Sequence, residues 1–352
     1  MKQKILALVL ATILFPAALV AQVSFGKATL WADGWKHSVD TPKSGTTTYT
    51  KTFNMKDLRK AETYHLYLDG FKGGVGAEMQ VYLNGHLLGS RTNGYVSFIY
   101  EMTPYIDKEQ DNVLKLVATG KNRELGRDIY LVTAPKTHLS KWGIEYQYQP
   151  DSDGNGRLLI SSSITWIHDE GYSLSAELSD DMEGKHVVAT SEEIPLAVDA
   201  DSIHQLHIPL SEAKVWNLSR PNLYLLTVML HKGGKVVCRG KVKVGLKTTE
   251  LVNNKKLLLN GQPVLLKKFV YEEKEPLAKE EMRKQLIGLK SKGYNAIVLQ
   301  CPQVPAFYDL CDELGVLVFE GKAGKWASAD VGDIYQRDRV HPSVIFDKQY
   351  WK

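Results

Sequence analysis

The 352 residues carry 44 Lys and Arg against 40 Asp and Glu, a formal net charge of +4 at pH 7, and 43% of them are hydrophobic. A hydrophobic fraction of this size is typical of globular domains and excludes a disordered or fibrous chain. The length predicts two to three domains. The small, dispersed net charge does not indicate a nucleic-acid-binding protein.

The first 22 residues have the pattern of a secretory signal peptide. Lys2 and Lys4 precede an apolar run over residues 5–20, and small residues end the segment. A membrane anchor is the alternative, but the run is short for a membrane span and contains Pro16. We therefore expect residues 1–22 to be removed, leaving a periplasmic or secreted protein with no membrane span.

The three cysteines, Cys238, Cys301 and Cys311, lie within apolar patterns. Buried free thiols fit this placement better than a disulfide framework, because three cysteines cannot all pair within one chain. Cys301 with Cys311 is the only plausible bridge, and the sequence leaves their pairing open. No histidine stands near them at ligand spacing, so neither a metal nor another cofactor is predicted.

Residues 23–135 contain short apolar runs separated by turn residues, a pattern that predicts an all-β sandwich. Asn84 and Gly85 are the strongest local signal, because an Asn-Gly pair supplies the positive φ angles that a two-residue hairpin turn requires. Strands are expected at residues 49–53, 65–68, 79–83, 95–100, 113–117 and 129–132.

Residues 136–248 predict a second sandwich, with strands at 158–166, 172–178, 204–208, 223–230 and 235–244. Residues 151–156 superficially resemble a calcium loop, but the twelfth position holds Ser162 instead of Glu, so a hairpin turn or an acidic loop is favoured. The histidines form no ligand set and are interpreted as structural or exposed: His138, His168, His186, His204, His207 and His231.

From residue 249 to residue 352 the pattern changes to alternating strands and helices, which is typical of an α/β unit. A helix over residues 279–292 places Met282, Leu286 and Leu289 on one face, and Gly293 suits its C-terminus. Further elements are expected at 295–299 (strand), 305–314 (helix), 316–319 (strand), 331–339 (helix) and 343–346 (strand).

Several segments resemble, in order and spacing, glycoside hydrolase family 2, the β-galactosidase and β-glucuronidase family. Residues 81–89, 94–95, 102–106 and 112–117 are similar to its sugar-binding jelly roll, and residues 220–224 and 244–250 to its immunoglobulin-like spacer. Residues 257–267, 295–299, 307–319 and 337–345 resemble the leading hairpin and first half of its catalytic barrel. The resemblance implies a mainly β chain with a C-terminal α/β part: a jelly-roll sandwich (23–135), an immunoglobulin-like sandwich (136–248) and an incomplete TIM-barrel half (249–352).

The resemblance also implies hydrolysis of O-glycosyl bonds by two carboxylates at the ends of barrel strands. Counting from His341 places Trp351 and Lys352 on the family's Asn-Glu acid/base pair, and a Lys does not serve as a carboxyl acid and base. The family's nucleophile comes from a later strand. Residues 270–273 and 298–301 also depart from the family's sugar-site motifs. We therefore expect a chain that lacks both catalytic carboxylates and is inactive alone.

The remaining acidic residues do not form an evident alternative site. Glu272, Glu273 and Glu275 are interleaved with Lys274, and Asp309, Asp312 and Glu313 lie on a helix with an apolar face; both groups are interpreted as solvated charges. Glu320 is the best single candidate, because it follows a strand at the carboxyl end, where barrel chemistry is located. Without a partner carboxylate it does not define a catalytic site, so no catalytic residue is assigned.

Three hypotheses about function follow. The favoured one is a family 2 member that binds carbohydrate or a protein partner without catalysis; the alternatives are a gene fragment and a glycosidase with an unusual site. Weak glycan binding is expected in residues 23–135, where Trp31, Trp35, Tyr95 and Tyr105 could stack on sugar rings, although packing is their commoner role. The unpaired edge at residues 343–346 predicts a homodimer or a protein partner through residues 295–352.

Overall fold

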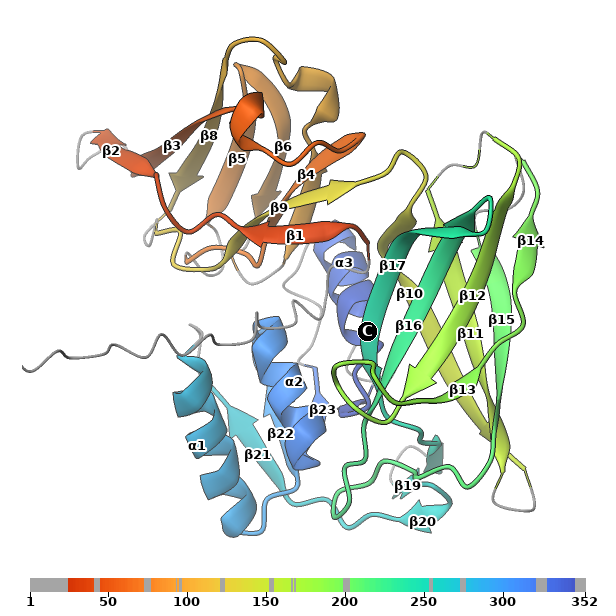
Figure 1. Cartoon of the computed structure of the whole chain (residues 1–352). Coiled ribbons are helices and arrows are strands. Elements are labelled where there is room, and N and C mark those ends of the chain that lie inside the picture. The colour runs from red at the N-terminus through yellow and green to blue at the C-terminus, as the bar shows by residue number, and fades with distance from the viewer. Residues whose placement is uncertain are drawn as a thin grey trace, which may run out of the picture.

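The computed structural model describes residues 25–40, 45–72, 77–92, 94, 97–120, 124–151, 155–165, 167, 169–198, 203–252, 256–272, 277–320 and 328–345. In helix α3, the side chains are described from residue 332 onward. Two β-sandwiches are followed by an α/β segment, as Figure 1 shows in red to yellow, green, and cyan to blue. The expected fold class is confirmed. No helix in the described part of the chain is long and apolar enough to cross a membrane.

The first sandwich consists of two antiparallel sheets around one core. One sheet has the order β1 (Lys27–Leu30), β9 (Ile129–Ala134), β4 (Thr63–Leu68), β7 (Phe98–Glu101). The other has the order β2 (Lys36–Asp40), β3 (Thr46–Asn54), β8 (Asp111–Thr119), β5 (Glu78–Leu83), β6 (His86–Thr92), and two short helices, η1 (Met55–Asp57) and η2 (Thr103–Tyr105), connect strands. The predicted β5–β6 hairpin is confirmed, with φ of 51° at Asn84 and 84° at Gly85.

The second sandwich also has two antiparallel sheets. They contain β10 (Leu139–Pro150), β11 (Gly156–Ile164) and β15 (Ile203–Leu210), and β13 (Val187–Thr190), β12 (Tyr172–Ser179), β16 (Tyr224–Lys232) and β17 (Lys235–Val244), with β14 (Ile194–Leu196) paired to β12. β10 pairs with β11 in antiparallel register, with Pro150 opposite Gly156, and residues 152–154 of the predicted turn or acidic loop lie outside the described residues. The sequence pattern missed β10, because a bulge at Trp142, where φ is 49°, interrupts its alternation.

The α/β segment begins with a three-stranded meander and continues as a parallel sheet. The meander is β18 (Thr249–Val252), β19 (Lys256–Leu259), β20 (Gln262–Pro263); the sheet is β21 (Lys268–Tyr271), β22 (Ala296–Leu299), β23 (Leu317–Phe319), β24 (Val344–Ile345), with helices α1 (Lys279–Ser291), α2 (Pro305–Leu314) and α3 (Ser328–Asp338). The resemblance of residues 257–267 to the family's leading hairpin and first barrel strand places that strand too early, because the first parallel strand, β21, begins at Lys268. The Asn295 side chain holds that connection, accepting from Lys267 N at 2.8 Å and donating to Leu265 O at 2.9 Å.

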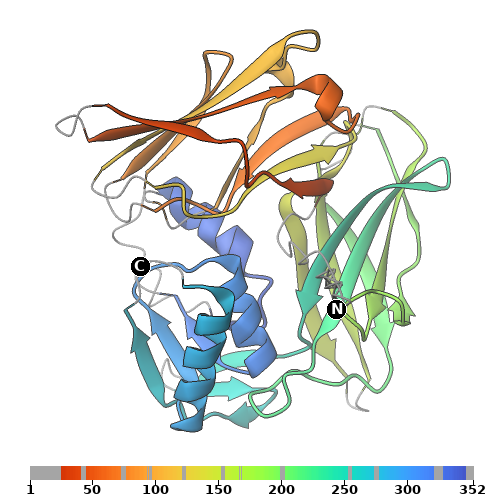
Figure 2. The same cartoon turned by 60° about the vertical axis from the view of Figure 1, so that its left-hand side comes forward.

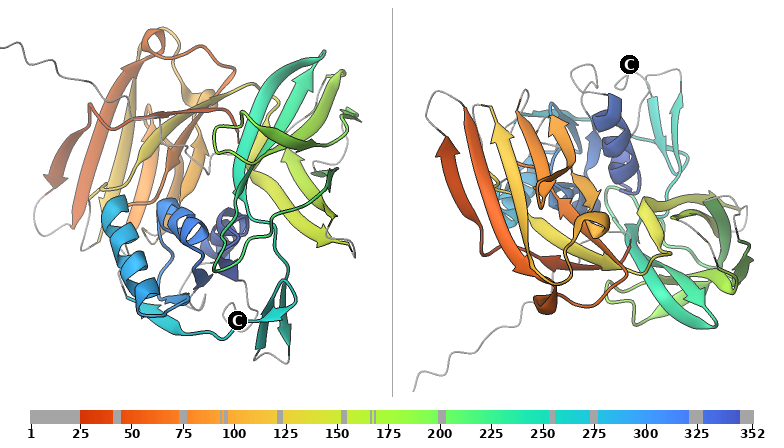
Figure 3. Two further views of the ribbon diagram at one scale, coloured as in Figure 1. Left: turned by 60° about the horizontal axis from the view of Figure 1, so that its bottom comes forward. Right: turned by 90° about the horizontal axis from the view of Figure 1, so that it is seen from above.

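Both sandwiches contact the α/β segment, which positions its carboxyl edge. Trp216 of the second sandwich is fully buried and donates through Nε1 to the carbonyl oxygen of Asp312 in α2 at 2.9 Å. Helix α3 lies beneath the first sandwich (Figure 2), and Figure 3 shows the α/β segment beside both sandwiches. Asp333 of α3 pairs with Arg91 of β6 and, at 3.2 Å, with Lys141 of β10. The last helix is therefore tied to all three units.

Candidate functional site

The carboxyl edge of the parallel sheet is where the fold brings polar side chains together. Glu272 follows β21, Gln300 and Cys301 follow β22, and Glu320 follows β23. The prediction that Glu320 lies at this edge is confirmed, because β23 ends at Phe319 and runs parallel to its neighbours. The residue after β24 lies outside the described range.

Glu320 is buried, with 2% of its surface exposed, and it is engaged by the protein. The hydroxyl of Tyr308, on α2, donates to its Oε1 at 2.5 Å. Burial and the nearby carboxylate of Asp338 raise the pKa of Glu320 to about 8, while Arg337 acts in the opposite direction. The carboxyl is therefore mostly protonated at neutral pH. The expectation that Glu320 has no partner carboxylate was wrong, because the end of α3 brings Asp338 to it.

Arg337 is the centre of this buried network. Its Nε and Nη2 donate to the two carboxylate oxygens of Asp338 at 2.6 and 2.8 Å, a bidentate pair that is fully buried on both sides. Its Nη1 donates to Ser97 Oγ of the first sandwich at 3.1 Å, and its Nη2 also donates to Gln303 O at 3.0 Å. The first sandwich thus closes over this part of the carboxyl edge.

The network continues into the first sandwich through Tyr67 and Asp69. The Tyr67 hydroxyl donates to Asp69, and burial raises the pKa of Asp69 to about 6, with Asp128 adding to the rise and with Tyr67 and Arg337 opposing it. The sequence marks Arg337 and Asp338 only as part of the segment 337–345 and predicts no role for either. The Arg-Asp pair at a helix end was the available signal, but its contact with Ser97 joins residues 240 positions apart.

A second buried cluster contradicts the interpretation of Asp309 and Asp312 as solvated charges. Both are buried, because α2 turns them toward the second sandwich and β24. Asp312 contacts His341 Nδ1 at 2.6 Å and accepts from the Ser343 backbone N–H at 2.9 Å. Lys243 pairs with Asp309 at 3.3 Å. Glu313 is partly exposed and pairs with Lys243 at 3.2 Å and Arg283 at 2.7 Å.

This second cluster connects domains. Burial by itself lowers the pKa of His341, but the hydrogen-bonded Asp312 and the nearby Asp309 outweigh it and raise that pKa. The donor atoms of Asp309, Asp312 and His341 lie within 4.8 Å of one another, close enough to share a cation. Lys243 already supplies a positive charge at Asp309, and Asp312 is bonded on both oxygens. The arrangement therefore stabilises the contact between α2, β24 and the second sandwich.

The remaining predicted residues are dispersed. Trp31 packs against Phe53 with ring centroids 5.1 Å apart and is a core residue, so it is not a sugar platform. Trp35 is half-buried and donates to Trp31 O at 2.8 Å. Tyr105 is 40% exposed and stacks on His86, with ring centroids 4.9 Å apart.

Several predictions fall outside the described residues. These are the signal peptide at 1–22, Tyr95, His168, Glu273 to Glu275, and the acid/base positions Trp351 and Lys352. His138 is buried and stacked on Phe25, which agrees with a structural role. No disulfide joins Cys301 to Cys311, and Cys238 and Cys311 are buried thiols.

Comparison with known proteins yields one consistent group of relatives. The family model described as "Glycosyl hydrolases family 2" matches residues 137–247. A putative β-glucuronidase of Formosa agariphila is 25% identical over 340 residues, covering 86% of this chain and 40% of that protein. A β-galactosidase of Bacteroides ovatus is 23% identical over 332 residues, covering 84% and 38%. This chain spans about two fifths of the length of these curated relatives.

Solved structures agree on the fold. A glycosyl hydrolase family 2 member of Bacteroides cellulosilyticus has a TM-score of 0.78 at 18% identity, covering 90% of this chain and 52% of that one. A β-glycosidase of Bacteroides vulgatus has a TM-score of 0.73 at 24% identity, covering 92% and 44%. At these identities the likeness concerns the fold alone, and it matches the two sandwiches and partial barrel described above.

Proposed function

This chain belongs to glycoside hydrolase family 2, and from that premise we propose that it is a β-galactosidase-like or β-glucuronidase-like protein of carbohydrate metabolism that binds carbohydrate but does not hydrolyse glycosides by itself. The burial of Glu320 carries the second half of the proposal. A retaining glycosidase needs two carboxyl groups about 5 Å apart that both reach the substrate. Glu320 is bonded to Tyr308, and its neighbour Asp338 is held by Arg337, so neither carboxyl is presented to a sugar.

Glu272 does not supply a second carboxylate for catalysis with Glu320. It is exposed at the end of β21, whereas Glu320 follows β23, and β22 lies between these two strands. Because neighbouring strands are roughly 4.8 Å apart, two strand spacings separate these positions by roughly 10 Å. That separation is about twice what a retaining mechanism uses. Glu272 and Glu320 therefore do not form the closely spaced pair that a retaining mechanism uses.

We expect the purified protein to show no turnover of p-nitrophenyl β-galactoside, β-glucuronide or β-mannoside. Release of nitrophenol is the measurement, with Glu320→Gln assayed beside the wild type. Equal slow turnover in both proteins would indicate a contaminant or another site. Turnover in the wild type that disappears in Glu320→Gln would contradict the proposal, because it would make Glu320 a catalytic acid or nucleophile.

Two further parts of the proposal concern place and partners. We propose that the protein is exported to the periplasm or secreted, on the basis of the pattern in residues 1–22.

We also propose self-association through the parallel sheet. Among the described strands, β21 and β24 each pair with one neighbour only. Val270 on β21 is 49% exposed and the nearby Leu265 is 92% exposed, so the edge at β21, outside the predicted interface of residues 295–352, is added to it here. Unpaired edges beside exposed apolar side chains are features that soluble monomers usually avoid.

Light scattering coupled to size exclusion is expected to give the mass of a dimer. Val270→Glu should shift the protein toward monomer, because it places a charge in the proposed interface. Ile287→Glu is a matched control, since Ile287 is also 49% exposed but lies on α1. A wild-type protein that stays monomeric at micromolar concentration would contradict self-association.

A further inference from the structure

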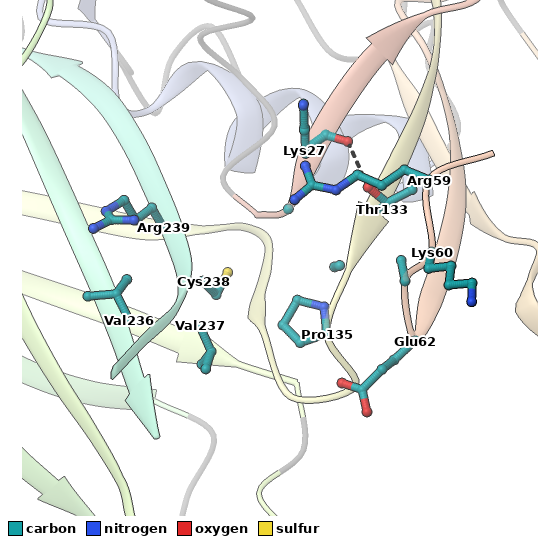
Figure 4. Close-up of a pocket in the computed structure, with 13 residues that line it drawn as sticks. Lys27, Arg59, Lys60, Glu62, Thr133, Pro135, Val236, Val237, Cys238 and Arg239 are labelled. Carbon is teal, nitrogen blue, oxygen red and sulfur yellow. Dashed lines mark hydrogen bonds between the residues drawn. The ribbon is translucent and has the colours of Figure 1, made fainter. Parts of the chain in front are cut away.

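The two sandwiches meet at a pocket of about 380 Å³ (Figure 4). Its lining comes from the start of β1, the loop between η1 and β4, the end of β9, and β17. Pro135, where the chain passes from the first sandwich toward the second, is part of the wall. The pocket therefore exists only when both sandwiches are folded and packed. Its volume lies within the range of small-ligand sites, roughly 300–1,000 Å³.

Positive charge dominates the rim of this pocket. Four of its lining side chains are cationic, Lys27, Arg59, Lys60 and Arg239, and one, Glu62, is a carboxylate. The resulting formal charge of +3 is concentrated at one place, whereas the entire 352-residue chain carries only +4. A concave surface lined by one sign of charge raises the local concentration of oppositely charged ligands.

No protein carboxylate within the described ranges neutralises these cations. The Glu62 carboxylate instead accepts a hydrogen bond from the backbone N–H of Lys136 at 2.9 Å, in the segment that connects the two sandwiches. The four cationic side chains are exposed to solvent and form no ion pair with described residues. Figure 4 shows Lys27, Arg59 and Lys60 on the first-sandwich side and Arg239 across from them on β17. In this view the Arg59 guanidinium extends toward β17, whereas the Lys60 and Arg239 side chains extend outward, so Arg59 is the cation that an anion in the pocket would meet first.

Uncharged side chains form the buried part of the pocket. Ala134 and Cys238 are buried there, and Thr133 donates to the carbonyl oxygen of Lys27 at 3.4 Å. Pro135 and the exposed Val237 add apolar surface beside the cations. Apolar surface suits the C–H face of a sugar ring, whereas guanidinium and ammonium groups suit carboxylate or sulfate oxygens.

We propose that this interdomain pocket binds an acidic carbohydrate, a sugar that carries carboxylate or sulfate groups. The inference rests on the proposed carbohydrate-binding function and adds to it a site and the charge of the ligand. The pocket is separate from the carboxyl edge of the parallel sheet, since none of its lining residues belongs to the α/β segment.

Titration calorimetry on the full chain at low salt tests this inference with three tetrasaccharides. Chondroitin 4-sulfate tetrasaccharide carries sulfate and carboxylate groups, unsulfated chondroitin tetrasaccharide carries carboxylates alone, and chitotetraose is neutral. We expect at least one acidic ligand to bind about tenfold or more tightly than chitotetraose, with an affinity that falls as salt is added. The unsulfated arm tells whether carboxylates suffice or sulfate is required.

The variant that removes the site is Arg59→Gln with Arg239→Gln, which takes one cation from each side. It should weaken acidic-ligand binding about tenfold or more, because charge-assisted bonds are lost on both sides. The matched control is Lys56→Gln with Lys235→Gln, which removes two exposed cations from η1 and β17 outside the pocket. The control should bind like the wild type, and thermal melting should show that both variants are folded.

The outcomes separate this inference from the function on which it rests. An equal loss of acidic-ligand affinity in both double variants would overturn the proposal that this pocket is the binding site. It would show that the ligand is attracted only by the overall charge of the protein. Binding of chitotetraose as tight as that of the acidic ligands, unchanged by Arg59→Gln with Arg239→Gln, would overturn the acidic site while leaving carbohydrate binding in place. Failure of all three oligosaccharides to bind would overturn both.

Discussion

Replacing Arg337 with Met is expected to destabilise the folded protein by about 3–5 kcal/mol, the usual cost of leaving one member of a buried ion pair without its partner. Arg337 and Asp338 are both fully buried, and Arg337 also donates to Ser97 and Gln303. The substitution would leave the Asp338 carboxylate buried beside Glu320 without a neutralising charge. Urea unfolding followed by tryptophan fluorescence measures the loss.

Arg339→Met is the control for this experiment, two positions further along the chain. Arg339 pairs with Glu145 at 3.1 Å, but both side chains are partly exposed, so its removal should cost about 0–1 kcal/mol. Arg337→Met combined with Asp338→Leu should recover much of the stability, because replacing both members of a buried pair removes the unpaired charge. Equal effects of Arg337→Met and Arg339→Met would show that the buried network does not connect the domains as described.

Glu320→Gln is expected to be more stable than the wild type near pH 8 and to have a flatter dependence of stability on pH. Burial and Asp338 raise the pKa of Glu320 to about 8 in the folded protein, whereas the unfolded chain has its ordinary pKa near 4.5. The folded state therefore holds the proton more tightly. This contribution to stability is fully present below about pH 4.5, decreases as pH rises, and is lost by about pH 8.

Glutamine keeps an oxygen that can accept from Tyr308 and has no proton to lose. The difference between wild-type and variant stabilities should therefore grow from pH 5 to pH 8 and reach on the order of 2–5 kcal/mol. Asp69 and His341, whose pKa values are also raised, are present in both proteins, so the difference isolates Glu320. Thermal or urea unfolding at several pH values is the measurement. Parallel curves for the two proteins would mean that Glu320 is ionised throughout.

Local patterns in the sequence predicted the helices, strands and turns whose conformation depends on residues adjacent in the chain. The hairpin at Asn84 and Gly85 follows from the positive φ angles these residues tolerate. Helix α2 has its expected bounds, since Pro305 suits a first helical turn and Gly315, at φ 65°, suits a helix end. The alternation of strand and helix after residue 249 likewise predicted the parallel sheet and placed Glu320 at its carboxyl edge.

The environment of each functional candidate was decided only by the tertiary structure. Glu320 and Asp338 share a buried network because α3 returns to the carboxyl edge, and Ser97 reaches Arg337 from another domain. Asp312, whose pattern indicated a solvated helix face, is buried against His341, 29 residues away. The interdomain pocket likewise depends on tertiary packing, because Arg59 and Arg239, which both line it, come from different domains. Backbone conformation depends mainly on adjacent residues, so sequence patterns determined the elements; burial, charge pairing and pKa depend on neighbours far apart in the chain, so only the packed domains determine them.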